Sequence, residues 1–338
     1  MKKTIFFLLL GFALFSCKNK SGAPDVSGIS VHIPVERFDQ HLFSIDTNDI
    51  ASGLRKLQEQ HPDFYLDFMQ NILGVSGSDT SGTTLEITRE FLRGYAPVQQ
   101  YLAASFKNTD RLQQELEQAY RYVKYYFPHY KTGKAVLFTG PFDAPGVASV
   151  NAGIAIGLQQ YAGNDYPEYQ APVFQEMFPS YISRRFSREY IVANCMKAVT
   201  EELFPDRSAG KPLIEQMIEK GKQWYVLDRF LPGSPDSIKT GFTQKQLDWC
   251  SENEGLIWAY IIRNEDLNSL SPAVLQTYIG EAPFTQGFSQ EQSPGNLGQW
   301  IGWQIVKKFA AKNAGISIQD LMQTAAATIN EQAKYKPK

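Results

Sequence analysis

The segment from residue 134 to residue 205 constrains the fold of this chain more than any other. Residues 134–139 are strand-forming and stop at a Gly-Pro pair, and residues 147–158 form a second run in which apolar and small residues alternate. A long helical pattern then covers residues 181–204 and ends at Pro205. Two strands that lead into one buried helix, with helical segments on both sides, predict an α+β domain with a small central sheet.

Helical periodicity recurs on both sides of this segment. Before it, we expect a short strand or extended entry at residues 35–43, followed by helices at residues 48–59, 63–73, 85–106 (kinked or restarted at Pro97) and 110–127. After it, we expect helices at residues 213–231 and 273–279, and others that begin at Thr243, Leu297 and Ser317. Residues 280–295 form an irregular loop of a length often associated with function. Residues 31–338 are therefore predicted to form a single, predominantly helical domain.

The N-terminus has the features of a bacterial lipoprotein signal. A basic start precedes an apolar run at residues 5–15, which is too short to span a membrane because a spanning helix needs about 20 residues. The run ends in Leu14-Phe15-Ser16-Cys17, a lipobox. We therefore expect residues 1–16 to be a signal peptide that is cleaved before Cys17. Acyl chains such as palmitate on Cys17 would then anchor the protein in the membrane.

Residues 17–30 are predicted to be the acylated cysteine and a flexible tether, because they are polar and rich in Gly, Ser and Pro. No acidic cluster follows Cys17, and this favours a periplasm-facing protein over one exported to the cell surface. The alternative is an ordinary secretory signal with a coincidental cysteine.

Composition argues against some classes of partner and does not decide whether the cysteines form a disulfide. The net charge of −2 and the absence of a basic block argue against nucleic acid as a partner. Aromatic residues make up 13% of the chain, which indicates either a rich core or an aromatic interface. Beyond Cys17 only Cys195 and Cys250 remain. Cys195 falls within a helical apolar pattern, so buried thiols are favoured over a disulfide.

Two strands before one helix are also the plan of zinc-peptidase domains, which need two histidines one helical turn apart. The four histidines here do not meet that spacing and none follows the second strand; they are His32, His41, His61 and His129. The central helix offers Asn194, Cys195 and Lys197 instead. The sequence therefore predicts a zincin-like domain with no metal-binding motif, no metal and no cofactor.

Charged clusters in the central segment can be interpreted either as solvated surface residues or as parts of a functional site. Glu201 and Glu202 could serve a metal-dependent hydrolase through unusual ligands, but adjacent carboxylates on a helix point to different faces. Arg184, Arg185 and Arg188 form a small basic cluster before the central helix. We interpret it as a solvated face in preference to an anion site.

Aromatic residues supply candidate binding positions. Gly298 and Gly302 lie four apart beside two tryptophans, which favours close packing of their helix against the central one, because the run is too polar to dimerise in a membrane. A tight aromatic turn, Asn164-Asp-Tyr-Pro167, follows the segment of residues 158–163. We predict an aromatic-lined groove with these candidate residues: Tyr161, Asp165, Tyr166, Trp300 and Trp303.

Several motifs, in order along nearly the whole chain, resemble one family. After the lipobox come Val35-Glu-Arg-Phe-Asp39 with Leu42-Phe43, His61-Pro-Asp-Phe64, Asn71-Ile-Leu-Gly74, Tyr125-Tyr-Phe-Pro128, residues 158–165 and Gly298-Gln-Trp-Ile-Gly302. Together they resemble the gliding-motility lipoprotein GldB of Bacteroidetes. The central block also looks like a zincin-type peptidase fold that has lost its ligands.

The resemblance implies a cell-envelope lipoprotein that is associated with the gliding machinery and the linked type IX secretion system. On this basis we expect a non-enzymatic accessory or scaffold protein, held at the membrane by Cys17 and bound to other envelope proteins. The alternatives are a zincin-like hydrolase that acts on peptides or cell-wall polymers, and a carbohydrate-binding envelope module.

Overall fold

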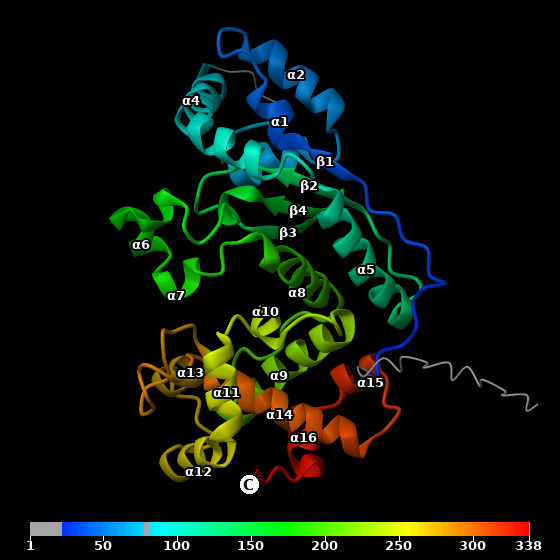
Figure 1. Cartoon of the computed structure of the whole chain (residues 1–338), viewed down its shortest axis with the longest axis vertical. Helices are drawn as coiled ribbons and strands as arrows, with labels where there is room; N and C mark the ends of the chain where they lie inside the picture. Colours follow the sequence, from blue (N-terminus) through cyan, green and yellow to red (C-terminus); the bar gives the residue numbers. More distant parts are fainter. Residues whose placement is uncertain (1–21, 78–81, 338) are drawn as a thin grey trace, which may run out of the picture.

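Strands β2 (Lys134–Phe138) and β4 (Gly153–Gly157) distribute their side chains between two hydrophobic layers, and this alternation sets the architecture. In the computed structural model, which describes residues 22–77 and 82–337, Leu137 and Ile156 belong to one buried cluster while Val136 belongs to the other. The sheet is therefore covered on both faces (Figure 1). Cys17 and the predicted signal peptide lie outside the described residues.

Within those residues the strands form one four-stranded sheet of order β1-β2-β4-β3. Strand β1 (Val35–Arg37) pairs in parallel with β2, and β2 pairs in parallel with β4. Edge strand β3 (Val147–Val150) is antiparallel to β4. The prediction of a single strand at residues 147–158 was therefore wrong. The run folds into a hairpin, because Gly153 adopts φ +133°, a conformation that permits the reversal.

Helices before residue 206 pack around this sheet. The cluster that contains Val136 is built with α1 (Phe38–Phe43), α2 (Ile50–Gln60), α3 (Tyr65–Asp67), the π-helical turn Phe68–Ile72 and α4 (Gly82–Ser105), which continues through Pro97. On the opposite face lie α5 (Asp110–Tyr126) and α8 (Ile191–Leu203). Short helices α6 (Pro172–Met177) and α7 (Ser180–Ser183) extend to the side (Figure 1).

The predicted continuous helix at residues 181–204 is also wrong. It is interrupted between α7 and α8, where Ser187 is extended and residues 188–190 form a 3-10 turn. A tertiary bond explains the break. The Phe186 carbonyl accepts from the Gly163 N–H at 3.0 Å, whereas in a continuous helix it would accept from Tyr190.

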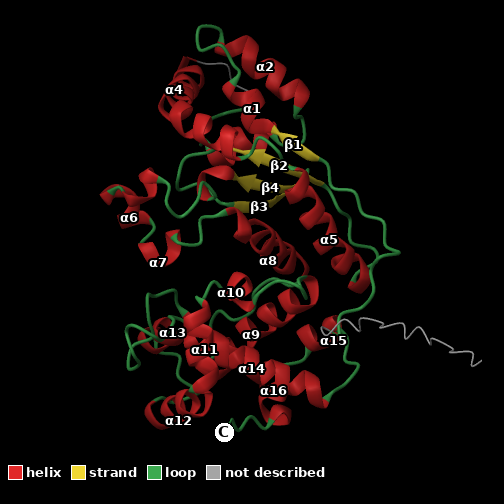
Figure 2. Ribbon diagram, in the orientation of Figure 1, coloured by secondary structure: helices red, strands yellow, loops and turns green. Residues whose placement is uncertain are grey.

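The rest of the chain is helical (Figure 2). Its helices are α9 (Leu213–Phe230), α10 (Asp236–Thr240), α11 (Gln244–Glu252), α12 (Glu254–Asn264), α13 (Pro272–Ile279), α14 (Leu297–Lys312), α15 (Ile318–Gln323) and α16 (Ala326–Ala333). Thr243 and Gln246 form the predicted capping box, and Ser317 caps α15. No helix among the described residues is long and apolar enough to cross a membrane.

Helices α9 and α14 cross with their backbones in contact. A Cβ on Gly302 would lie 1.7 Å from the Met217 carbonyl oxygen, and a Cβ on Gly221 would lie 2.2 Å from the Gly302 carbonyl carbon. The glycine spacing thus marks close helix packing, as predicted, but the partner is α9 and not the central helix α8. Gly221 on α9 also lacks a side chain at the crossing, which lets the α14 backbone approach closely.

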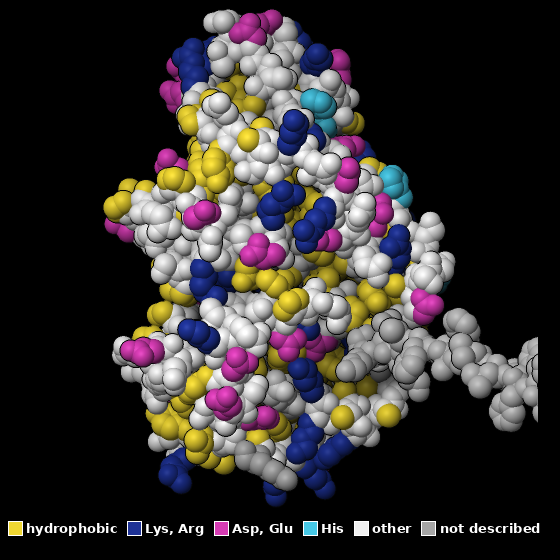
Figure 3. Space-filling model, in the orientation of Figure 1, with side chains coloured by type: hydrophobic (Ala, Val, Ile, Leu, Met, Phe, Trp, Pro, Cys, Tyr) yellow, Lys and Arg dark blue, Asp and Glu magenta, His cyan; other side chains and the backbone are white. Residues whose placement is uncertain are grey.

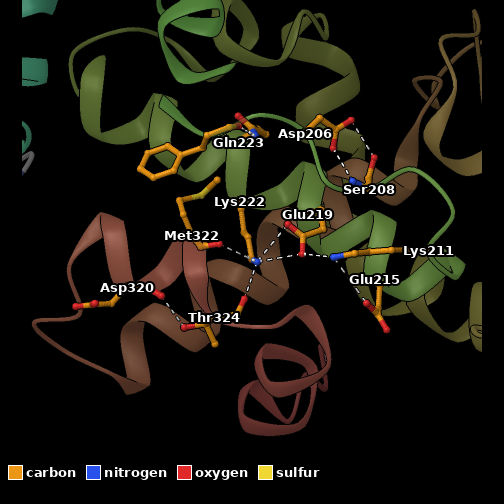
Figure 4. Close-up of polar contacts among 11 residues, drawn as sticks. Asp206, Ser208, Lys211, Glu215, Glu219, Lys222, Gln223, Asp320, Met322 and Thr324 are labelled. Atoms are coloured by element: carbon orange, nitrogen blue, oxygen red, sulfur yellow. Dashed lines mark hydrogen bonds and ion pairs between the residues drawn. The ribbon is translucent and has the colours of Figure 1, made fainter. Parts of the chain in front are cut away.

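A buried ionic network fastens the C-terminal helices to α9 (Figure 4). The Lys222 ammonium, only 1% exposed, donates to both carboxylate oxygens of Glu219 at 3.1 and 3.2 Å. It also donates to the Thr324 and Met322 carbonyl oxygens at 2.7 and 3.4 Å. Lys211 pairs with the same carboxylate at 3.0 Å. Burial lowers the pKa of Lys222, and these contacts offset that cost.

Candidate functional site

A large hollow of about 890 Å³ lies between α5, the start of α8 and residues 230–238. We call it the α5–α8 groove. Its floor is apolar and combines the partly exposed side chains of Val192, Pro232 and Ile238 with buried core residues such as Leu112, Ala119 and Phe230. Because concave apolar surfaces with a few polar groups are the usual binding sites of proteins, this groove is the leading candidate for the functional site.

Local sequence explains each wall of the α5–α8 groove. On α5, apolar residues at helical spacing turn Leu112 and Ala119 toward α8. Helix α9 ends at Phe230, and Pro232 directs the chain across the groove. Leu112 and Phe230 also belong to the core beneath the groove, so the floor is held by tertiary packing.

Charged side chains form the rim of this groove. Arg111 and Glu115 make an exposed ion pair at 2.8 Å on α5. Arg188 donates to the Ser105 carbonyl oxygen at 2.8 Å, and its guanidinium lies 4.5 Å from the centroid of the Phe106 ring. Figure 3 shows hydrophobic side chains across the middle of this face, with Lys and Arg side chains beside them. An apolar floor with a charged rim is the usual anatomy of a protein-binding surface.

The predicted aromatic groove does not form. Tyr161, Tyr166, Trp300 and Trp303 are 2%, 6%, 3% and 1% exposed, so all four are core residues, and only Asp165 is exposed. The prediction was wrong because large aromatic side chains bury more apolar area in the interior than at a groove wall.

Polar partners inside the protein hold these aromatics. The Tyr161 hydroxyl accepts from the Asn194 amide at 2.9 Å, and Trp303 Nε1 donates to Asp228 at 2.9 Å. The Lys307 ammonium lies 3.1 Å from the centroid of the Trp303 ring. Edges of Trp300 and Trp303 reach a separate hollow of about 300 Å³.

Helix α8 carries Asn194, Cys195 and Lys197, the residues found where a zinc peptidase would have its histidine ligands. Cys195 is fully buried and unpaired, as is Cys250, so the prediction of buried thiols is confirmed. Burial raises the pKa of both thiols, which makes them poor nucleophiles. Lys197 donates to the Asn194 side-chain oxygen at 3.5 Å, and desolvation lowers its pKa to about 8.

The two adjacent glutamates of α8 diverge, as their spacing predicted. Glu201 accepts from the Asp206 N–H at 2.9 Å, whereas Glu202 accepts from the Tyr130 hydroxyl at 3.0 Å. Among residues 22–77 and 82–337, no group of three or more His, Cys, Asp or Glu side chains is arranged to hold a metal ion. The described residues therefore offer no ready set of metal ligands.

The basic cluster before α8 joins the two halves of the molecule. Arg184 donates to the Gly241 carbonyl oxygen at 2.6 Å, and burial lowers its pKa. Arg185 pairs with Glu281 at 3.2 Å. Interpretation of the cluster as a solvated face was thus wrong for these two residues, because both guanidinium groups cross-link α7 to distant loops.

Sequence reasoning missed the α5–α8 groove itself. The apolar residues of segment 110–127 form a stripe at helical spacing that predicts α5, but this spacing does not show that part of the stripe stays open. The groove opens because residues 231–235, Leu-Pro-Gly-Ser-Pro, cross beside that stripe without filling it. An apolar stripe next to a Pro-rich connection is the signal that could have indicated it.

Comparison with known proteins identifies a family. The family model described as gliding motility protein GldB matches residues 19–337. No curated protein and no solved structure matches the chain.

Proposed function

Because the chain belongs to the family of gliding motility protein GldB, we propose that it is a non-enzymatic envelope lipoprotein that binds partner proteins of the gliding machinery. The observation that carries this proposal is the α5–α8 groove, with its apolar floor and charged rim. The partner is a protein of the envelope machinery with an apolar segment that fits the groove, and charged groups that match the rim orient it.

Photo-crosslinking in living cells tests this proposal. A benzophenone side chain is introduced in place of Tyr122 or Ile238, both of which line the α5–α8 groove. The control places the same group at Val173, which is 74% exposed on α6. We expect both groove positions, and not the control, to capture the same envelope protein. Equal capture at Val173, or none in the groove, would refute the proposal.

We also propose that Cys17 anchors the protein in the membrane and that the folded domain faces the periplasm. The lipobox and the lipoprotein family support this. Replacing Cys17 by alanine should move the protein from the membrane fraction to the soluble fraction, or leave it as an uncleaved precursor. A mature Cys17→Ala protein that stays in the membrane would contradict the anchor.

The central block is proposed to be a zincin-like fold that has lost its metal. The support is that hairpin strands β3 and β4 precede helix α8, as in the zinc-peptidase plan, while Asn194 and Lys197 stand where ligands would lie. The competing metal-dependent hydrolase requires about one metal ion per chain. Elemental analysis of protein purified without added metal or chelator distinguishes the two, since stoichiometric zinc would overturn the non-enzymatic proposal.

A further inference from the structure

A second hollow, of about 520 Å³, lies beside edge strand β3 and shares no lining residue with the α5–α8 groove. We call it the β3 hollow. It is formed where the β3–β4 turn, the loop before β2, and the C-terminal end of α8 meet. Most of its side chains carry hydroxyl, amide or charged groups, including Asp67, Tyr130, Lys131, Ser149, Asn151 and Glu202.

Hydrogen bonds within the protein join three of these polar groups, Glu202, Tyr130 and Ser149. Glu202 Oε2 accepts from the Tyr130 hydroxyl at 3.0 Å and from Ser149 Oγ at 3.4 Å. The Tyr130 ring stacks with the ring of buried Tyr120, with centroids 6.1 Å apart. Within the described residues Glu202 Oε1 has no hydrogen-bond partner. The hollow thus presents a free acceptor beside a half-exposed aromatic ring.

Backbone forms part of the wall of the β3 hollow. A Cβ on Gly133 would lie 2.3 Å from the Ala152 carbonyl oxygen, and Gly153 has φ +133°. Glycine at both positions therefore lets the two backbone segments approach closely at the wall of the hollow.

The charge balance selects the class of ligand. Two carboxylates, on Asp67 and Glu202, and one ammonium, on Lys131, give −2 + 1 = −1. A carboxylate or phosphate ligand is therefore repelled. A neutral polyhydroxy ligand can donate to the free Glu202 oxygen and accept from Ser149, Lys131 and the Asn151 amide. Its apolar C–H face can lie on the Tyr130 ring.

We propose that the β3 hollow is a binding site for a neutral saccharide, with Glu202 and Tyr130 as its main contacts. Because Glu202, Tyr130 and Ser149 are already joined by hydrogen bonds, binding costs little ordering of these three side chains. This site does not depend on the partner-binding role of the α5–α8 groove. An extended peptide that pairs with edge strand β3 is the competing occupant.

Isothermal titration calorimetry on the full-length lipoprotein, in a detergent without a sugar headgroup, tests the proposal. The probes are chitohexaose, cellohexaose and maltohexaose, with hexagalacturonate as the charged comparison. We expect at least one neutral hexaose to bind and hexagalacturonate to bind more weakly. Glu202→Gln should weaken binding by about ten-fold, since it replaces a charged hydrogen-bond acceptor by a neutral one. Tyr130→Ala should also weaken binding, since it removes the ring on which the sugar lies.

Glu201→Gln is the matched control, because this neighbouring glutamate bonds to the Asp206 N–H and does not line the β3 hollow. It should leave the affinity unchanged. Glu202 is exposed, so its glutamine variant should fold, and this is checked by thermal unfolding. Absence of binding by all three neutral sugars would overturn the proposal. So would sugar binding that Glu202→Gln leaves unchanged, or an unstructured peptide that binds in place of the sugars.

Discussion

Replacing Gly302 by alanine tests the crossing of α9 and α14. The added Cβ would lie 1.7 Å from the Met217 carbonyl oxygen and 2.2 Å from the Met217 carbonyl carbon. These are backbone atoms, so no side chain can rotate to make room. The two helices must therefore separate. Gly221 of α9 already packs closely against the backbone of Gly302, so no free space at the crossing can accept the added Cβ.

The size of the effect follows from that geometry. A carbon–oxygen contact needs about 3.3 Å, so the local separation is about 1.6 Å. Overpacking costs about 1–3 kcal/mol when side chains can move. Here the obstacle is backbone, so we expect about 3 kcal/mol or more. The higher helix propensity of alanine relative to glycine offsets about 1 kcal/mol of this loss of unfolding free energy. The net loss of unfolding free energy is therefore about 2 kcal/mol or more.

Urea unfolding, followed by tryptophan fluorescence, measures this loss. The Trp224 and Trp303 rings lie 5.8 Å apart at the same helix pair and report on it directly. Gly94→Ala is the matched control, because Gly94 is exposed within α4 and a Cβ there meets no heavy atom within 4 Å. Gly94→Ala should gain up to about 1 kcal/mol. A Gly302→Ala protein as stable as the wild type would refute the reasoning.

Three further predictions concern stability and are checked by urea unfolding. Glu219→Ala should lower the free energy of unfolding by about 3–5 kcal/mol, because it leaves the Lys222 ammonium buried without its carboxylate partner. Lys222→Met should lower it less, because Glu219 is still paired with Lys211. Equal losses for the two variants would contradict this. Desolvation lowers the pKa of Lys197 to about 8 from 10.5, so between these values the unfolded chain binds a proton that the folded protein does not. The wild type should therefore gain stability relative to Lys197→Met as pH rises through this window, and parallel pH profiles would show that the pKa is not lowered. Thr243→Ala should cost about 1 kcal/mol through loss of the capping box, and an unchanged midpoint would exclude a role for the cap.

Local signals in the sequence predicted many of the elements. The capping box at Thr243, the helical periodicity of residues 110–127 and the glycine pair of α14 each depend on residues that recur within about two helical turns of one another. Where a local signal competed with a tertiary bond, the prediction failed. The helical pattern of residues 181–204 broke because Phe186 bonds to Gly163.

The candidate sites were less accessible to sequence reasoning than the fold. Tyr161 and Trp303 were proposed for a groove because they are aromatic, but aromatic character is equally suited to a core, and only packing distinguishes the two. Glu202 was considered with its neighbour Glu201 as a carboxylate pair. In the structure Glu202 instead accepts hydrogen bonds from Ser149 and from Tyr130, which lies 72 positions earlier in the chain.

By itself, the sequence determined the helix-rich α+β class and the family of this protein, because both follow from short-range patterns or from ordered motifs along the chain. It also predicts a lipoprotein signal that ends at Cys17. Only the tertiary structure decided which surfaces remain open. The α5–α8 groove and the β3 hollow each combine elements far apart in the sequence, and their volumes are set by how those elements pack. A cavity is space that packing leaves unfilled, and no local pattern of residues encodes it.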